Sequence, residues 1–177
     1  GLFYAMQGFV SLLMPALVGI VADRWIPAQK LLGICHLLGA GFLATAGFYG
    51  MNHGENIDFS ILFSLYSLSV MFYMPTIALS NSVAYSILVN HNYDTIKTFP
   101  PIRTFGTIGF IFAMLFVNFA GIQNENFTIN LNNNSDFVSF QNTYAQFFVS
   151  AILGLISFLY SSTLPNCPIN KSSEKQS

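Results

Sequence analysis

The sequence predicts an all-α integral membrane protein, and three observations lead to this prediction. Five long stretches contain no Asp, Glu, Lys or Arg, and each reaches the roughly 18 to 20 residues that a helix needs to cross a bilayer. Charged residues make up 7% of the chain and hydrophobic residues 53%, whereas an average soluble domain has roughly 25% charged residues. The few charges lie almost entirely between the stretches. The predicted helices are about 2–22, 31–50, 59–89, 100–122 and 144–164.

The same composition argues against several classes of function. A net charge of −1 and the lack of a basic run argue against a nucleic-acid partner. The sequence holds no metal-ligand cluster, nucleophile–base pair or phosphate-binding glycine loop at helical spacing, so we expect neither an enzyme nor a bound metal or cofactor. The two cysteines, Cys35 and Cys167, suggest neither a disulfide framework nor a thiolate metal site, and we expect free thiols.

Lysine and arginine predict the orientation of the chain, because short loops that carry them stay in the cytoplasm. Arg24 and Lys30 follow the first stretch, Lys97 follows the third, and Lys171 and Lys175 follow the fifth. The gaps after the second and fourth stretches hold no cation, and their charges are those of Glu55, Asp58, Glu125 and Asp136. This alternation predicts that segments 23–30, 90–101 and 165–177 lie inside and that segments 51–58 and 123–142 lie outside.

The first predicted helix, 2–22, runs from outside to inside and leads into Asp23 and Arg24, with Trp25 at the level of the headgroups. Pro15 within it is tolerated where neighbouring helices satisfy the backbone. Because the sequence opens inside a hydrophobic helix, we expect one further helix upstream, which would bring the crossings to six. Asp23 and Arg24 are interpreted at this point as a charge pair at the membrane boundary, and a functional role for the two residues stays open.

The second predicted helix, 31–50, contains Cys35 and His36 among leucines and glycines. An ionisable group inside a membrane helix suggests a functional role by default. A neutral histidine that is hydrogen-bonded between helices is nevertheless the interpretation that we favour.

The third predicted helix, 59–89, is too long for a simple span, because its length at 1.5 Å per residue is about 46 Å. Pro75 is expected to kink it. Tyr73, Thr76 and Asn81 belong to a side of this helix that is rich in hydroxyl and amide groups. Such a side either packs against another helix or lines a wet cavity, and packing is the commoner outcome. The three residues are therefore candidate cavity-lining positions, with helix packing as the alternative.

The fourth predicted helix, 100–122, begins with two consecutive prolines, whose missing backbone donors suit a first helical turn. Arg103, Thr107 and Phe110 follow at spacings i, i+4 and i+7 and form one stripe. A cation, a hydroxyl and an aromatic ring on one face could hydrogen-bond and stack on a planar polar ligand. The alternative, which the spacing alone slightly favours, is an arginine that snorkels to the cytoplasmic headgroups.

The fifth predicted helix, 144–164, follows an Asn-rich outer loop to which we assign no function. The segment 166–177 is polar and lacks periodicity, so it is predicted to be a cytoplasmic linker or a truncated tail. Residues 1–165 are therefore predicted to form one partial transmembrane bundle.

Several motifs resemble those of one transporter family. Segment 14–25, MPALVGIVADRW, looks like the loop motif between the second and third helices of major facilitator superfamily transporters. Segments 73–86 (YMPTIALSNSVAYS) and 99–110 (FPPIRTFGTIGF) are similar to helices four and five of the bacterial nucleoside:proton symporters, and Cys35-His36 matches their third helix. The resemblance implies a major-facilitator-type helical bundle, of which this chain provides five of the six helices of the N-terminal half.

The resemblance also implies roles for individual residues. In the family, the residues that match Arg103, Thr107 and Phe110 face a central cavity and help to hold the nucleoside, which favours this role over the snorkelling arginine. Gly19 belongs to the matching loop motif, and the resemblance implies that it takes part in conformational gating together with Asp23 and Arg24. The pair Asp23 and Arg24 would clamp the cytoplasmic side of the outward-open state through charge pairs and helix-dipole contacts.

The implied function is proton-coupled uptake of nucleosides by alternating access across the bacterial inner membrane, in a multi-pass protein. The implied partners are a nucleoside, a proton, the lipid bilayer, a first helix and a second half of six helices, where the family keeps its acidic residues for proton coupling. This stretch alone is not expected to transport. Two alternatives remain: a major facilitator transporter of sugars or another small polar solute, and a membrane protein with a structural or signalling role.

Overall fold

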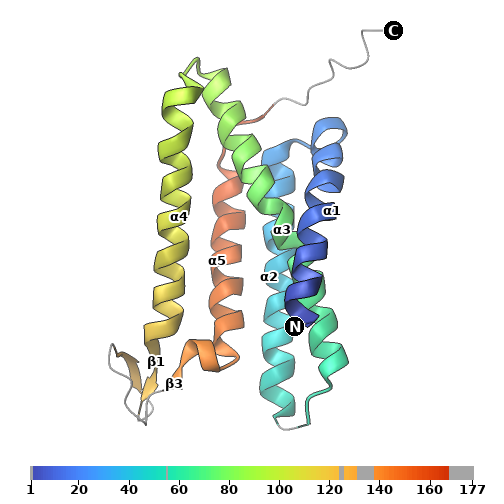
Figure 1. Cartoon of the computed structure of the whole chain (residues 1–177), viewed down its shortest axis with the longest axis vertical. Coiled ribbons are helices and arrows are strands. Elements are labelled where there is room, and N and C mark those ends of the chain that lie inside the picture. The colour runs from blue at the N-terminus through green and yellow to red at the C-terminus, as the bar shows by residue number, and fades with distance from the viewer. Residues whose placement is uncertain (1, 55, 124–125, 131–137, 168–177) are drawn as a thin grey trace.

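Five long helices make up most of the structure, a computed structural model that describes residues 2–54, 56–123, 126–130 and 138–167 (Figure 1). All five are long and apolar enough to cross a membrane. They confirm the predicted all-α membrane fold. The helices are α1 (Leu2–Arg24), α2 (Ala28–His53), α3 (Phe59–Asn90), α4 (Thr95–Phe119) and α5 (Ala145–Ser162).

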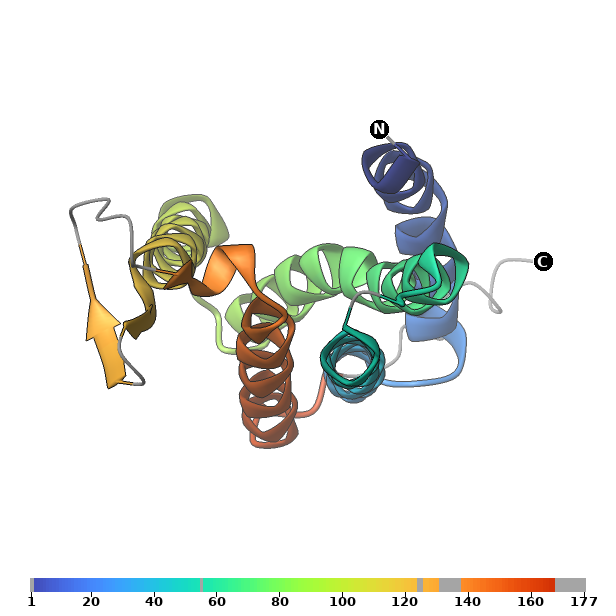
Figure 2. The same ribbon diagram turned by 90° about the horizontal axis from the view of Figure 1, so that it is seen from below.

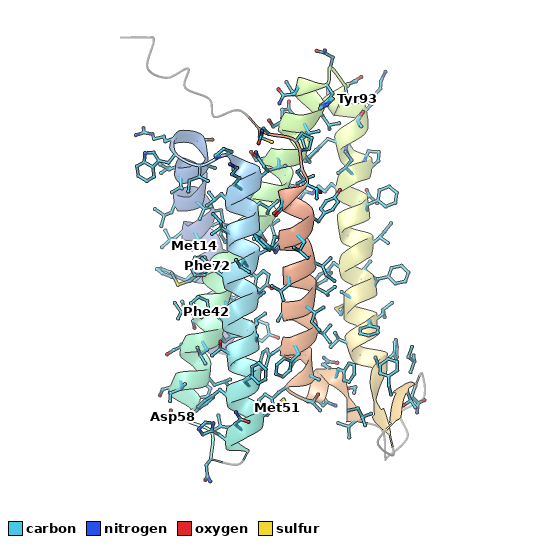
Figure 3. The ribbon with its side chains drawn as sticks, turned by 180° about the vertical axis from the view of Figure 1, so that it is seen from behind. Met14, Phe42, Met51, Asp58, Phe72 and Tyr93 are labelled. Atoms are coloured by element: carbon cyan, nitrogen blue, oxygen red, sulfur yellow. The ribbon has the colours of Figure 1, made fainter. Side chains whose placement is uncertain are left out.

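Successive helices run in opposite directions, so the connections lie at two ends of the bundle (Figure 1). Arg24 ends α1, Lys30 lies in the first turn of α2, and Lys97 lies in the first turn of α4. These three cations therefore share one end, which we call the cytoplasmic end, as the charge pattern predicts. Asp58 caps α3 at the opposite, outer end (Figure 3). The other charges used for orientation, at 55, 125, 136, 171 and 175, lie outside the described residues.

The helix α2 packs against both α3 and α5, and α1 packs against α3. Figure 2 shows α1 and α4 on opposite sides of the molecule, with α3 between them. Phe42 of α2 and Phe72 of α3 stack with ring centroids 5.9 Å apart (Figure 3). Two apolar clusters form the core: one joins α1, α2 and α3 near the cytoplasmic end, and the other joins α2 and α5 through Ala40, Leu43 and Ala151.

The fourth helix differs from its predicted bounds at both ends. It begins at Thr95 instead of residue 100, because the Asp94 side chain accepts hydrogen bonds from the backbone N–H groups of Ile96 and Lys97 and so caps the helix earlier. The two prolines consequently lie inside the helix, where a membrane helix tolerates them. The helix ends at Phe119, because the residues that follow it pair as a strand.

A small antiparallel sheet follows α4 at the outer end, where the sequence analysis expected a loop. Its strands are β1 (Ala120–Gln123), β2 (Asn126–Ile129) and β3 (Val138–Ser139), in the order β2-β1-β3, and a 3₁₀ turn, η1 (Phe140–Asn142), leads towards α5. Phe116 of α4 meets the rings of Phe127 and Phe140, with centroids 6.5 Å and 6.4 Å apart. These rings hold the sheet against the end of α4.

The other helices differ from their predicted bounds by one to three residues at an end. Pro27 serves as the N-cap of α2, so this helix begins at Ala28 and includes Lys30. Asn166 and Cys167, the described part of the predicted linker, are docked on the bundle, and Cys167 is buried in the cluster at the cytoplasmic end. Residues 168–177 lie outside the described part of the chain.

Candidate functional site

Tyr73 joins three helices at the centre of the bundle. Its ring lies against Gly39 of α2, where an added Cβ would come within 3.0 Å of the ring. Its hydroxyl donates a hydrogen bond of 3.3 Å to the backbone carbonyl of Ser150 in α5. The same hydroxyl lies directly over Gly154, which has no side chain to obstruct it. Glycine at these two positions therefore lets α2 and α5 approach the tyrosine closely.

His36 meets the ring of Tyr73 edge-on, with ring centroids 5.9 Å apart and an interplanar angle of 71°. Its Nδ1 atom is buried and has no hydrogen-bond partner among the residues that the structure describes. The favoured expectation of a histidine hydrogen-bonded between helices is therefore wrong for this nitrogen within the described residues. The neighbour of His36 on α3 is the ring of Tyr73, so an aromatic contact takes the place of the hydrogen bond.

Replacing Tyr73 by phenylalanine is expected to lower the free energy of unfolding by about 0.5–1 kcal/mol, because it removes one hydrogen bond between helices and keeps the ring. Thermal unfolding in detergent of the natural protein that contains this chain measures the effect. Tyr85→Phe is the matched control, since Tyr85 belongs to the same helix and is exposed. Equal melting temperatures for the parent and Tyr73→Phe would contradict the role of the hydroxyl.

A cavity of about 580 Å³ lies beside Tyr73, between all five helices. Its wall combines aromatic rings with hydrogen-bonding groups. The chemically distinctive lining residues are Gln7, His36, Tyr66, Tyr73, Phe110 and Gln146. Phe110 reaches this cavity from α4, and its side chain is not packed against the other four helices over most of its surface. Such a wall suits a ligand that has both a flat apolar face and polar edges.

Arg103 and Thr107 precede Phe110 on the same stripe of α4, towards the cytoplasmic end. Both side chains are exposed, and the Thr107 hydroxyl donates a 3.4 Å hydrogen bond to the carbonyl of Arg103. Neither residue lines the 580 Å³ cavity. No described residue of α4 is buried, so the whole stripe lies open. The structure therefore places Phe110 at the central cavity. Arg103 and Thr107, the other two predicted ligand contacts, lie on the exposed face of α4 towards the cytoplasmic end.

The three candidate cavity-lining residues of α3 lie in different surroundings. Tyr73 lines the central cavity, whereas Thr76 and Asn81 do not. Thr76 is buried, and its hydroxyl donates a 2.6 Å hydrogen bond to the carbonyl of Tyr73 within the same helix. Asn81 is half-buried. The contacts of Tyr73 with α2 and α5 are those of the packing alternative, whereas the hydrogen bond of Thr76 stays within α3.

The predicted gating residues lie along the end of α1. An added Cβ at Gly19 would meet no atom within 4 Å, so this face of the helix is open. Asp23 borders a second cavity, of about 440 Å³, between the cytoplasmic ends of α1, α2 and α3. Arg24 is exposed at the last position of the helix. Within the described residues the structure records one ion pair, Lys97 with Asp94 at 3.6 Å, so neither Asp23 nor Arg24 has an ionic partner there.

The sequence analysis did not select Gln7, Tyr66 or Gln146 as cavity residues, although all three line the central cavity. A signal was present for the two glutamines, because each is an amide inside a stretch without charges. Polar groups in a membrane helix tend to face the protein interior. Tyr66 gave no such signal, since tyrosines are frequent in this sequence.

The sequence of the whole chain matches one protein family. The family model described as nucleoside H⁺ symporter matches residues 1–177, the whole chain. The chain belongs to the nucleoside H⁺ symporter family. The resemblance found in the motifs is thereby confirmed, and the match to a crystal structure of nucleoside transporter NupG confirms the major-facilitator-type bundle.

Relatives of this symporter-family chain are named as permeases. Xanthosine permease of Escherichia coli (strain K12) is 34% identical over 169 residues, which are 96% of this chain and 34% of that protein. Nucleoside permease NupG of the same bacterium is 35% identical over 177 residues, which are 100% of this chain and 36% of that protein. A crystal structure of nucleoside transporter NupG matches with a TM-score of 0.77 and 34% identity, over 99% of this chain and 37% of that one. The symporter-family chain thus spans about a third of the length of these relatives.

Proposed function

We propose that this chain provides five helices of the first half of a proton-coupled nucleoside transporter in the bacterial inner membrane. Family membership supports the proposal, as do relatives named xanthosine permease and nucleoside permease. In this proposal the chain acts with a further helix and a second six-helix half. The two halves rock about a site near the middle of the membrane, so that the site opens to each side in turn.

The observation that carries the proposal is the open stripe on α4. Arg103 lies about 12 Å from the start of this helix at 1.5 Å per residue, and no charged residue follows it in the helix. A guanidinium turned towards lipid would be costly, which favours a position facing a water-filled path. There, Arg103 and Thr107 can hydrogen-bond the base edge or the ribose hydroxyls, and Phe110 can stack on the base.

Proton entry would supply the energy for accumulation. One proton that moves inward gains about 2.3 kcal/mol per 100 mV and about 1.4 kcal/mol per pH unit. Together these terms support accumulation by a few hundred-fold. The five uncharged stretches hold no Asp or Glu, so we propose that the carboxylates that carry the proton belong to the second half of the transporter.

Uptake tests this function directly. Cells without their own nucleoside permeases, expressing the natural protein that contains this chain, should accumulate labelled uridine. Unlabelled nucleosides should compete with it, sugars should not, and a protonophore should abolish accumulation. Uptake at the background level would reject nucleoside transport, and competition by sugars alone would favour the sugar-transporter alternative.

Phe110→Ala is expected to weaken nucleoside binding roughly tenfold, because the stacking of one base on an aromatic ring is worth about 1–3 kcal/mol. Isothermal titration of the purified natural protein with uridine measures the change. Phe105→Ala is the matched control, since Phe105 is also exposed on α4 but does not line the central cavity. An unchanged Kd for Phe110→Ala, or an equal loss in both variants, would count against stacking at this position.

A further inference from the structure

Gln29, in the first turn of α2, fastens the segment that follows α5 to this helix, which here means that it holds the segment by two hydrogen bonds. Its Nε2 donates a 2.9 Å hydrogen bond to the Oδ1 atom of Asn166, and its Oε1 accepts a 3.1 Å hydrogen bond from the backbone N–H of Cys167. Gln29 is 3% exposed, and Cys167 is 4% exposed. One buried amide thus uses both its donor and its acceptor on a segment that is 137 to 138 residues away along the chain.

The fastened segment also contacts the neighbourhood of Asp23. Cys167 packs in the same apolar cluster as Ala22, Leu31 and Cys35. Together with Asp23 and Ala28, it lines the 440 Å³ cavity at the cytoplasmic ends of α1, α2 and α3. The chain that leaves α5 therefore forms one wall of the cavity that the predicted gating carboxylate borders.

A buried amide whose nitrogen and oxygen are both hydrogen-bonded favours one arrangement, because breaking either bond leaves a group of Gln29 unpaired away from water. The contacts of Gln29 should therefore prevent the end of α5 from moving independently of α1 and α2. In an alternating-access transporter, the cytoplasmic ends of the helices are the parts that must change between two arrangements.

We propose that Gln29 is a positioning residue for transport: by holding Asn166 and Cys167 it makes the cytoplasmic ends of α1, α2 and α5 move as one unit. The effect of Gln29 on transport rests on the proposed function, whereas its two hydrogen bonds to Asn166 and Cys167 do not depend on that function. Without the amide, the segment after α5 detaches, the wall of the Asp23 cavity opens, and the Cys167 thiol becomes accessible from the cytoplasmic side. Gln29 touches no ligand in this proposal and acts only through the segment that it holds.

The thiol of Cys167 reports on the fastening. Inside-out vesicles that contain the natural protein are treated with N-ethylmaleimide, and alkylation at Cys167 is followed by mass spectrometry of its peptide. We expect alkylation in Gln29→Leu to be about tenfold faster than in the parent, the equivalent of about 1.4 kcal/mol. Maximal uptake should fall by up to the same factor, while the Kd for uridine stays unchanged, because the ligand site is left intact.

Three further variants keep the proposal testable if Gln29→Leu is poorly folded. Asn166→Asp retains the acceptor and should resemble the parent, whereas Asn166→Leu loses the acceptor and should speed alkylation. Gln141→Leu makes the same exchange at an exposed position of η1 and should change nothing. Equal alkylation rates for the parent, Gln29→Leu and Asn166→Leu would overturn the proposal. A parent that takes up no nucleoside but shows the expected alkylation pattern would reject the proposed function and retain the fastening.

Discussion

Replacing Arg103 by alanine is expected to weaken nucleoside binding by about 10- to 100-fold, because a hydrogen bond to a charged group is worth about 1.5–3 kcal/mol. The melting temperature should stay close to that of the parent. Arg103 is exposed and has no ionic partner among the described residues, so its removal leaves no buried group unsatisfied. Titration with uridine and a thermal melt of the same purified sample separate the two effects.

Lys97→Ala is the control for this loss of charge. Lys97 belongs to the same helix but lies in its first turn, with its side chain 85% exposed and paired only with Asp94 at the surface. Such a pair contributes little, and its removal should leave the Kd for uridine unchanged. Equal uridine binding by Arg103→Ala and the parent would reject a ligand contact and restore the arginine that snorkels to the headgroups.

Gly154→Leu should destabilise the fold by about 3 kcal/mol or more, since over-packing of a close contact forces the surrounding helices apart. An added Cβ would collide with the Tyr73 hydroxyl and would come within 2.9 Å of Ala40 Cβ. Its distance from the backbone carbonyl of His36 would be 3.4 Å, an ordinary contact, so the collisions are with the side chains of Tyr73 and Ala40. The contact between α2, α3 and α5 would then open. A strongly lowered melting temperature and poor yield of folded protein in detergent are the expected measurements.

The same exchange at Gly41 separates this steric effect from the general effect of replacing glycine. Gly41 lies in α2, and an added Cβ there would meet nothing within 4 Å. A helix also gains about 1 kcal/mol when glycine is replaced by a better helix former, so Gly41→Leu should be neutral or slightly stabilising. Similar melting temperatures for the two variants would show that the close approach at Gly154 does not limit stability.

The number and placing of the helices could be predicted because the bilayer imposes a simple requirement. A stretch that crosses hydrocarbon must be long, apolar and internally hydrogen-bonded, and the sequence shows these stretches directly. The bounds were less accurate where one side chain decides them. Asp94 starts α4 a full turn before the prolines, and the sheet beginning at Ala120 ends it early. Caps and short strand pairs depend on local geometry that periodicity does not encode.

Within the site, the residues that share one face of a helix could be predicted from their spacing in the sequence. Contacts between segments that are far apart in the sequence could not. The stripe of Arg103, Thr107 and Phe110 follows from helical periodicity, and the structure leaves it on one open face. The place of Tyr73 over Gly154 depends on how three helices meet, which no single helix reveals. The hydrogen bonds between Gln29 and residues 166 and 167 join segments that are 137 to 138 residues apart and could not be predicted from either segment alone.

The absence of buried residues among those described in α4 has a consequence for how ligand preference can change. Within the described residues, substitutions at the exposed positions 103, 107 and 110 of this helix remove little packing, so they cost little in folding. Substitutions at the close contacts between α2, α3 and α5, such as that at Gly154, would disturb the packing of these helices. In the proposed transporter, substitutions in the exposed stripe of Arg103, Thr107 and Phe110 can therefore alter ligand preference at little cost to the packing of α2, α3 and α5.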